Sequence, residues 1–470
     1  MRNKRWLALV ATGVLLGAAC GNDDGDSSPT TAAPETTAAA PGTTAAAPGT
    51  TAAAPETTAA PEPTGYAVDL SNCEDPEAAA APIEGDIVIG TSVPLSGGPA
   101  VLFAPYAAGF QAYFDSVNAQ GGVNGQQYQA VVKDDQYLAN LAVTNVEELI
   151  GSDGAHIISG VIGSPGNAAI QEDLNAQCIP HLWAATGAPS WGAIDEYPWS
   201  SGALIVYDIE ARGWLEFAKS QFPDGGTAGL FYVNNEFGQS YANAFKELAG
   251  EYGFELVAEE KIDAADSGAP SGQMTNLAAA DPDIILAVPL GAQCIGYMIE
   301  QGNAKAANPE FAPLTYITAT CANPVFFLPP GPAADGVYTS ANLKDVNNPD
   351  NQANDDAVKA YLEAFAASGS DANPGGIAVA GWIAAELTHH VVQQATETCG
   401  FVSQECVINA VRNIDYVPSL YRDGLSAKMG PDDAYAAEGL QIQQWSVEAG
   451  GFVDASEVLN FDGTTGVLGR

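Results

Sequence analysis

Basic residues are the scarcest charged class in this chain. Lysine and arginine together number 15 against 57 aspartates and glutamates, which gives a formal net charge of −42 at pH 7. So acidic a chain repels nucleic acid, and it repels polyanionic ligands unless a local basic pocket offsets the charge. The few basic residues are scattered along the sequence and predict no such pocket. We expect the acidic residues to form a solvated surface.

Long apolar runs and metal-binding patterns are also missing. After the first twenty residues, no hydrophobic stretch is long enough to span a bilayer. No Cys-x-x-Cys pair occurs, which argues against a thiolate zinc site. Glu386, His389 and His390 have a helical spacing that could hold a metal, but a partly exposed structural face is the commoner explanation. We therefore expect no metal and no cofactor.

The first twenty residues are typical of a secretion signal. Three basic residues precede an apolar run at 6–16, and small residues then lead to Cys20. Because the cysteine directly follows the small residues, the segment resembles a bacterial lipoprotein signal, although Gly17 stands where that family usually has leucine. The resemblance implies that Cys20 carries lipid and anchors the mature chain to the cell membrane, outside the cytoplasm. The alternative is an ordinary secretory signal with an incidental cysteine.

Residues 21–84 are predicted to form a disordered tether. As far as about residue 64 they are nearly all Thr, Ala, Pro, Glu and Gly, with recurring threonine pairs. Proline interrupts every repeat and no leucine or isoleucine occupies it, so the repeat is not that of a coiled coil. So little apolar surface cannot offset the entropy of ordering the chain. Such a tether would let a folded body stand off the membrane.

Six further cysteines follow, and an even number in an exported chain favours disulfides. Cys399 and Cys406 flank a short turn-like stretch and form the first predicted pair. Elimination and domain organisation give the other two predicted pairs, with other connectivities still open. They are Cys294 with Cys321 and Cys73 with Cys178.

From Asp86 onward, short β-branched runs alternate with longer helical patterns. This alternation predicts an α/β fold with βαβ crossovers and parallel sheets. The pattern restarts near residue 227, which predicts two similar lobes. The predicted strands are 87–93, 128–135, 156–163, 179–185, 227–233, 254–262, 283–290, 314–319 and 336–343, with a late antiparallel pair at 439–447 and 451–456. The predicted helices are 107–119, 140–152, 166–176, 239–252, 271–279, 292–303, 355–367 and 376–397.

Several segments together carry a family resemblance, in order and spacing, from about Gly85 to the C-terminus. The segments are IGTSVPLSGGP at 89–99, VNAQGGVNG at 117–125, KDDQYLANLAV at 133–143, VIGS at 161–164, AATGAP at 184–189 and NNEFGQSY at 234–241. With them the chain resembles the extracytoplasmic solute-binding proteins of ABC transporters, in the branched-chain amino acid or amide class.

The resemblance implies two Rossmann-like lobes with parallel sheets, joined by three crossings, and a ligand cleft that closes on a solute. The crossings are expected near 205–210, 333–338 and 437–440. The first lobe would comprise 85–206 and 338–438, and the second 207–337 and 439–470. The implied partners are a small-molecule solute and the permease and ATPase subunits of an importer, with no nucleic acid and the chain itself a monomer.

The strand-to-helix turn at 163–167 is the main candidate binding site. Pro165 fits the first helical position, where its missing N–H costs nothing, and Ser164 would then cap the helix. The free amides that follow, at Gly166 and Asn167, form a nest for a carboxylate at the sheet edge where open α/β folds bind ligands. In the resembled family the serine grips the solute's carboxylate. A serine that only caps its own helix is the alternative.

Other candidate residues lie in loops around the same cleft. In the resembled family, Thr186 and Gly187 correspond to a second hydroxyl and a backbone contact to the solute. Leu102 falls near an aromatic wall of that family, with Phe103 beside it. Phe237 stands where relatives often place tyrosine. For Leu102 and Phe103 a packing role is the alternative, and at Phe237 apolar stacking could survive without the hydroxyl.

One region departs from the family pattern. Amino acid binders of this class usually have an acidic residue near 314–319 to meet the ammonium group, whereas this chain reads Thr-Ala-Thr-Cys at 318–321. An unpaired buried ammonium is costly. Either Glu236 or Asp208 substitutes, or the solute is not an α-amino acid. We expect a small carboxylate- or amide-bearing solute with an apolar body.

Two other functions were weighed. A serine hydrolase is disfavoured because Ile162 replaces the first glycine of the G-x-S-x-G elbow and no histidine has the spacing of a base partner. A sensing receptor that reports its solute to a signalling partner shares the resembled fold. No transmembrane helix follows Arg470, which favours delivery to a transporter, so the sequence predicts a binding protein and not an enzyme.

Overall fold

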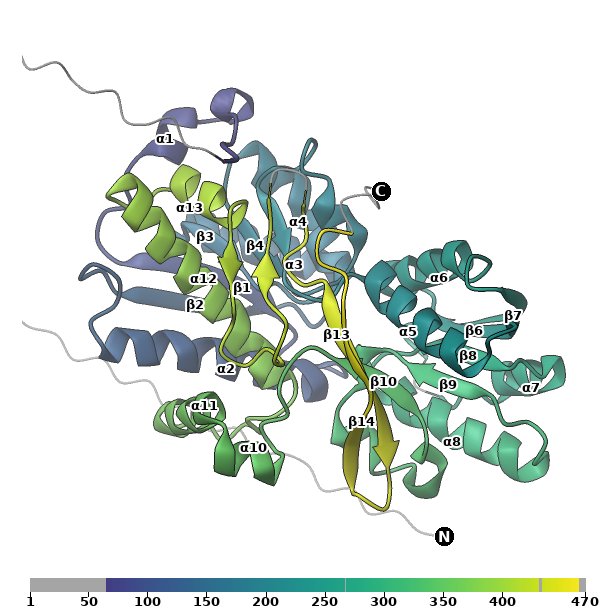
Figure 1. Ribbon diagram of the computed structural model, residues 1–470. Coiled ribbons are helices and arrows are strands. Elements are labelled where there is room, and N and C mark those ends of the chain that lie inside the picture. The colour runs from purple at the N-terminus through teal and green to yellow at the C-terminus, as the bar shows by residue number, and fades with distance from the viewer. Residues whose placement is uncertain (1–64, 267, 431–432, 465–470) are drawn as a thin grey trace, which may run out of the picture. The chain divides into compact units, whose positions relative to one another are not determined.

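The computed structural model describes residues 65–266, 268–430 and 433–464 (Figure 1). The predicted signal with Cys20 and the tether as far as residue 64 lie outside the described residues. Among the described residues, no helix is both long and apolar enough to cross a membrane.

The folded part starts earlier than the sequence predicted. Residues 65–84, assigned to the tether, contain a 3-10 helix, η1 (Leu70–Asn72), and α1 (Pro76–Ala80). The Asn409 side chain accepts a hydrogen bond from the Val68 amide at 2.8 Å. A disulfide also joins Cys73 to Cys178. These contacts with later parts of the chain order a segment that has little apolar surface of its own.

The first sheet has five parallel strands in the order β2-β1-β3-β4-β5. The strands are β1 (Ile87–Val93), β2 (Tyr128–Asp134), β3 (Ile157–Ser159), β4 (His181–Ala184) and β5 (Ser200–Gly202). Helices of the same lobe are α2 (Ala100–Ala119), α3 (Ala139–Gly151), α4 (Ser164–Ala176), α10 (Pro349–Asn354), α11 (Asp356–Ala367), α12 (Ile377–Cys399) and α13 (Gln404–Val411). Every residue of β1 is buried, as expected for a central strand of a parallel sheet.

The second sheet has seven strands in the order β14-β13-β10-β9-β8-β6-β7. Its parallel strands are β6 (Gly226–Val233), β7 (Phe254–Ile262), β8 (Ile284–Val288), β9 (Leu314–Ile317) and β10 (Tyr338–Ala341). The antiparallel pair is β13 (Gly439–Ser446) and β14 (Gly451–Asn460), as predicted. The helices include α5 (Tyr207–Gln221), α6 (Glu236–Leu248), α7 (Ser271–Ala280), α8 (Ala292–Ala307) and α9 (Pro324–Phe327).

Two details of the crossings differ from the prediction. β10 pairs with β9 and β13 in the second sheet, so the chain returns to the first lobe after Ala341 and not at 338. Helix α5 begins at Tyr207, within the stretch 205–210 that was expected to cross between the lobes and was not predicted to be helical. Most of its residues are buried, including Asp208 and Glu210, so its sequence lacks the single apolar stripe of a surface helix.

Close glycine contacts set the packing of two long helices of the first lobe. A Cβ at Gly109 of α2 would lie 1.9 Å from the carbonyl oxygen of Ala378, and a Cβ at Gly381 of α12 would lie 2.0 Å from that of Tyr106. The two backbones therefore approach as closely as only glycine allows. In Figure 1 α12 runs across α2.

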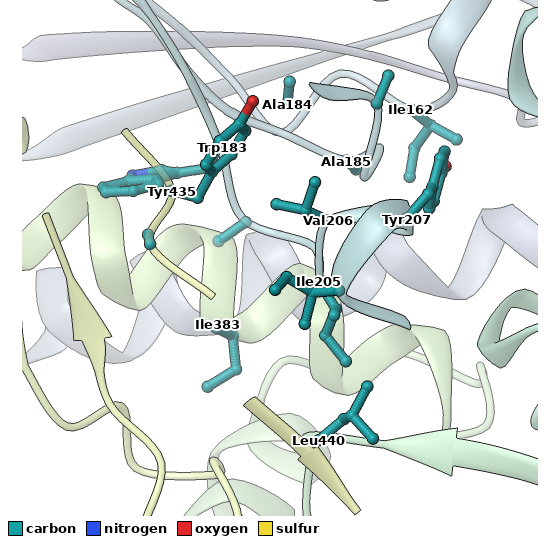
Figure 2. Close-up of a cluster of buried hydrophobic side chains, with 14 of the residues drawn as sticks. Ile162, Trp183, Ala184, Ala185, Ile205, Val206, Tyr207, Ile383, Tyr435 and Leu440 are labelled. Atoms are coloured by element: carbon teal, nitrogen blue, oxygen red, sulfur yellow. The ribbon is translucent and has the colours of Figure 1, made fainter. Parts of the chain in front are cut away.

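The three disulfides have the predicted pairing. They join Cys73 to Cys178, Cys294 to Cys321 and Cys399 to Cys406, with Cα–Cα distances of 5.4, 6.0 and 6.5 Å. Figure 2 shows part of the hydrophobic core around the start of α5. Trp183 of β4 lies near Tyr435, and Val206 lies near Ile205. Segments far apart in the sequence thus bury one another around the start of α5.

Candidate functional site

A cavity of about 210 Å³ is lined by residues of both lobes. Gly163 and Ala185 of its wall follow β3 and β4, so the cavity lies at the carboxyl ends of parallel strands, where open α/β sheets bind ligands. Most of the wall is apolar. Its apolar and aromatic residues include Leu102, Phe103, Tyr106, Tyr137, Ile162, Leu204, Ile205, Tyr207, Phe237, Tyr241, Leu290, Ile377, Val379 and Phe452.

Two groups of aromatic rings form opposite parts of the wall. In the first lobe Phe103 stacks on Tyr137, with ring centroids 5.7 Å apart and planes 3° from parallel. From the second lobe, Tyr207 and Tyr241 stack at 4.0 Å, and Phe237 meets each of them edge-on at 5.5 Å. Because each ring is held in place by its neighbours, the wall offers a preformed apolar surface to a solute with a flat or branched apolar part.

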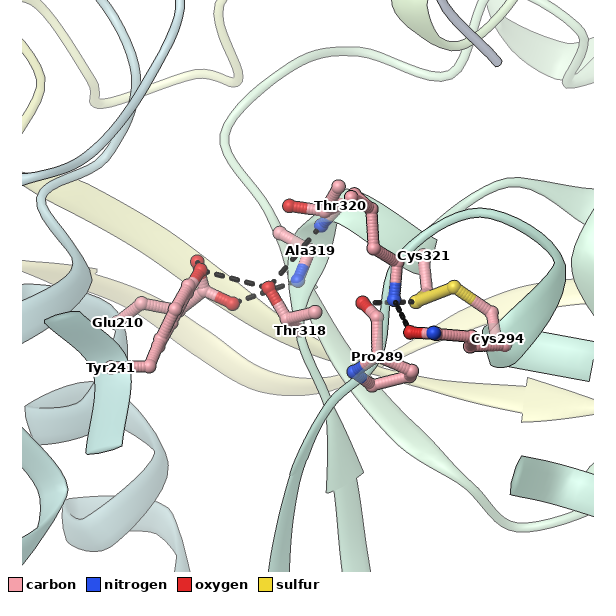
Figure 3. The surroundings of a disulfide bond; sticks show 10 residues. Glu210, Tyr241, Pro289, Cys294, Thr318, Ala319, Thr320 and Cys321 are labelled. Carbon is pink, nitrogen blue, oxygen red and sulfur yellow. Dashed lines mark hydrogen bonds between the residues drawn. A yellow bond between two sulfur atoms is a disulfide. The ribbon is translucent and has the colours of Figure 1, made fainter. Parts of the chain in front are cut away.

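One buried carboxylate, that of Glu210, also lines the cavity. Its Oε1 accepts hydrogen bonds from the Tyr316 hydroxyl at 2.5 Å and from the Ala319 amide at 2.7 Å. Its Oε2 accepts one from the Tyr241 hydroxyl at 2.5 Å. Since each tyrosine gives its only proton to Glu210, Thr318 donates to Tyr241, as Figure 3 shows. Three elements, α5, α6 and β9 with its following loop, therefore meet at this carboxylate.

Burial sets the protonation of this cluster. Removal from water raises the pKa of Glu210, and the hydrogen bonds from Tyr241, Tyr316 and Ala319 act in the opposite direction. Burial, together with the neighbouring Glu210 charge, raises the pKa of Tyr241 and of Tyr316 well above the usual value. Both hydroxyls therefore stay protonated at neutral pH and remain available as donors.

The hydroxyl groups predicted to grip the solute form a second, separate cluster. Ser164 Oγ lies 2.7 Å from Thr186 Oγ1, which lies 3.2 Å from the Tyr207 hydroxyl. Ser164 and Thr186 are both buried, and neither belongs to the cavity wall. Their hydroxyls are satisfied by one another and by Tyr207.

The prediction that Ser164 caps α4 is wrong. The cap is Gly163, and Ser164 is the first residue of the helix, with no side-chain capping hydrogen bond. The chain turns at Gly163 with φ of 91°, and a Cβ there would lie 2.5 Å from the Tyr137 ring. The close approach of that ring requires glycine at the turn, which starts the helix one residue earlier.

Three further predicted residues, Asn167, Gly187 and Gly166, pack near the two loops, and Asn167 holds the turn at 163–167 together. Asn167 is fully buried; its amide nitrogen donates to the carbonyls of Val161 and Gly163, and its amide oxygen lies 2.7 Å from His181 Nε2. Gly187 lies against the Tyr207 ring, since a Cβ there would be 2.6 Å from ring atom Cδ1. Gly166 packs near Ala142 of α3.

Of the other predicted site residues, Leu102, Phe103 and Phe237 line the cavity. Glu236 is exposed in the first turn of α6, and Asp208 is buried; neither lines the cavity. The carboxylate that reaches the region of residues 318–321 is instead Glu210.

Sequence reasoning missed Glu210 because it missed the helix that carries it. A signal was present in the spacing of Tyr207, Glu210 and Trp214, which lie three and four residues apart and so share one helix face. All three are buried.

Comparison with known proteins identifies the family. The family model described as "Periplasmic binding protein" matches residues 86–451, which is most of the chain. This chain is a periplasmic binding protein. The family and the α/β fold with two lobes of parallel strands are thus those expected from the sequence.

Individual relatives of this periplasmic binding protein are distant. It is 23% identical over 281 residues to Leu/Ile/Val-binding protein homolog 2 of Brucella abortus, covering 59% of this chain and 72% of the relative. The fatty acid ABC transporter substrate-binding protein from Thermomonospora curvata has a similar fold, with a TM-score of 0.68 at 20% identity, over 82% of this chain and 94% of that one. A solute-binding protein from R. palustris in complex with benzoate gives 0.64 at 19% identity, over 80% and 98%.

The hydroxyl geometry also bears on the hydrolase alternative. The hydrogen-bond partner of Ser164 is Thr186, and the nearby His181 bonds to Asn167. A serine nucleophile needs a hydrogen bond to a general base. Among the described residues, the partner of the Ser164 hydroxyl is the Thr186 hydroxyl, which is not such a base. The family and the relatives named above are binding proteins.

Proposed function

We propose that this protein is the extracytoplasmic solute-binding component of an ABC importer. It captures a small solute that has an apolar body and a carboxylate or amide group. The observation that supports this most is the mainly apolar cavity with wall residues from both lobes, such as Phe103 from the first and Phe237 from the second. A solute held from both sides favours the closed arrangement, because it gains contacts there that an open cleft does not offer.

The anchor belongs to the same proposal. Lipid on Cys20 would hold the protein at the membrane, beside the permease and ATPase subunits that receive the solute. Mass spectrometry of the full chain expressed in its host should find a diacylated N-terminal cysteine. A Cys20→Ser variant should be released from the membrane fraction. A variant that stays fully membrane-bound would contradict the anchor and leave solute binding untouched.

The binding test uses the full chain in detergent, with isothermal calorimetry against amino acids, amides and organic acids of branched or aromatic body. We expect at least one compound to bind, and Phe237→Ala to weaken it by roughly tenfold or more, because burying an aromatic side chain against a ligand contributes on the order of 2 kcal/mol. Phe401→Ala is the matched control, since Phe401 is 41% exposed and does not line the cavity. Equal losses in both variants would contradict this assignment of the cavity.

A further inference from the structure

The first lobe contributes polar residues to the cavity wall, among them Asn342, Lys344 and Arg422, but not the two hydroxyls predicted to grip the solute. On the first-lobe side, the Ser164 and Thr186 hydroxyls bond to one another and to Tyr207, whose ring lies over Gly187. Neither hydroxyl reaches the cavity wall. The Tyr207 hydroxyl thus occupies a place in this cluster where a solute oxygen would otherwise bond.

On the second-lobe side a carboxyl acceptor, that of Glu210, lies on the wall. The Glu210 side chain lines the cavity although the residue is only 2% exposed. Within the described chain, its Oε1 accepts from Tyr316 and Ala319, whereas its Oε2 accepts from Tyr241. A carboxylate oxygen can take two hydrogen bonds, so Oε2 keeps room for one more donor.

No protein cation neutralises this carboxylate among the described residues. The two basic side chains of the wall are Lys344 and Arg422, and they pair with Asp355 at 2.7 Å and Asp454 at 2.8 Å. The groups that face Glu210 are neutral hydroxyls and one amide. A buried carboxylate in such surroundings is stabilised by a further N–H donor and destabilised by a second carboxylate.

We propose that Glu210 selects solutes whose polar end is an N–H donor, an amine or amide, over solutes of the same body that end in a carboxylate. This rests on the proposed function: within its solute class it favours amides over carboxylates, and it extends that class to amines. The apolar body would lie against Phe103 and Phe237, with the nitrogen at Glu210 Oε2. The loop that gives Ala319 is tied to α8 by the Cys294–Cys321 disulfide, which keeps this corner of the cavity in place (Figure 3).

The test compares head groups on two fixed bodies. Phenylethylamine, phenylacetamide and phenylacetate form one series, and isopentylamine, isovaleramide and isovalerate the other. Calorimetry with the full chain at pH 7 should show the amine and the amide binding at least about tenfold tighter than the carboxylate of the same series. The Glu210→Gln variant should lose the preference for the amine and bind the carboxylate better. Glu236→Gln, an exposed acid outside the cavity, should leave the order unchanged.

The outcomes separate the two proposals. If the carboxylate of either series binds as tightly as its nitrogen counterparts, the selection by Glu210 is overturned while solute binding stands. If Glu210→Gln folds, as judged by circular dichroism, and keeps the wild-type order, the assignment to Glu210 is overturned. If that variant does not fold, the order of affinities for the amine, amide and carboxylate in the wild-type protein tests the proposal on its own. If none of the six compounds binds at millimolar concentration, the selection by Glu210 is overturned, whereas the proposed function is decided by the wider panel of amino acids, amides and organic acids.

Discussion

His181 is one of the most deeply buried titratable side chains in the first lobe. Its Nε2 lies 2.7 Å from the Asn167 amide oxygen, and its ring meets Trp191 edge-on at 5.8 Å. Burial lowers the pKa of His181 to about 3. The imidazole is therefore neutral in the folded protein and joins β4 to the turn before α4 through Asn167.

This burial predicts a loss of stability in mild acid. Unfolded histidine titrates near pH 6.5, so the contribution of His181 is fully present above that pH and is lost as pH falls toward 3. From His181 alone, unfolding takes up about one proton over this window, which lowers the free energy of unfolding by roughly 1.4 kcal/mol per pH unit. His389, whose pKa burial lowers to about 4, adds to the same slope. Urea titrations between pH 7 and pH 4.5 would measure the slope.

In a His181→Gln variant the acid slope should be shallower by about that amount, although the variant is less stable at pH 7. His390→Gln serves as the control, since His390 is only partly buried, with its ring stacked on that of Tyr416. A His181→Gln slope equal to that of the wild type would show that the proton uptake comes from other groups.

At the scale of single elements, the crossing of α2 and α12 decides how the first lobe is built. The Ala378 carbonyl lies against Gly109, and the Tyr106 carbonyl lies against Gly381. Tyr106 is also part of the cavity wall. The helix crossing therefore fixes one side of the binding cavity.

Adding one methyl group at this crossing should be costly. In Gly109→Ala the new Cβ would lie 1.9 Å from a backbone oxygen, so the helices must separate, at a cost of about 1–3 kcal/mol or more. Gly272→Ala in α7 is the matched control, because nothing lies within 4 Å of its Cβ. The control should be neutral or stabilising by up to about 1 kcal/mol. Thermal unfolding of both variants checks the difference, and equal melting temperatures would contradict it.

Sequence patterns predicted elements well where one physical signal dominated. β7 is found at Phe254–Ile262 and β1 at Ile87–Val93, with the predicted bounds, because β-branched runs between turns are a strong strand signal. α5 was missed because it is buried on most sides and carries Asp208 and Glu210 among its buried residues. Glu210 is explained by its partners Tyr241 of α6 and Tyr316 of β9, which no local pattern contains.

For the molecule as a whole, the three disulfides close loops of very different length. Cys73–Cys178 spans 105 residues, Cys294–Cys321 spans 27, and Cys399–Cys406 spans 7. The longest one ties the segment before β1 to the end of α4. It is the bond that most restricts the unfolded chain.

Removing disulfides should therefore destabilise the protein in order of loop length. Replacing both Cys73 and Cys178 by serine should lower the free energy of unfolding by about 4 to 5 kcal/mol, whereas replacing both Cys399 and Cys406 should cost less than about 3 kcal/mol. Denaturant unfolding of the two double variants measures both losses. A larger loss for the short loop would show that native-state packing, and not chain entropy, dominates.

The sequence predicted some residues of the cavity wall but not its carboxyl group, and the role of the cavity as the binding site stays a prediction. The order of segments from Gly85 onward placed the cleft at the ends of β3 and β4, and Leu102, Phe103 and Phe237 do line the cavity. The Glu210 carboxylate could not be placed in the wall from the sequence, because its position depends on α5, α6 and β9 coming together in space. Ser164 and Thr186 show the same limit, since only the folded chain brings the Tyr207 hydroxyl to them.

The start of α5 has a mechanical consequence. Tyr207 donates its amide to the Gly187 carbonyl of the first lobe, and one helical turn later Glu210 holds the Ala319 amide of the second. A rotation of one lobe relative to the other would therefore strain the first turn of α5. A solute hydrogen-bonded to Glu210 would therefore touch one of the links between the two lobes directly.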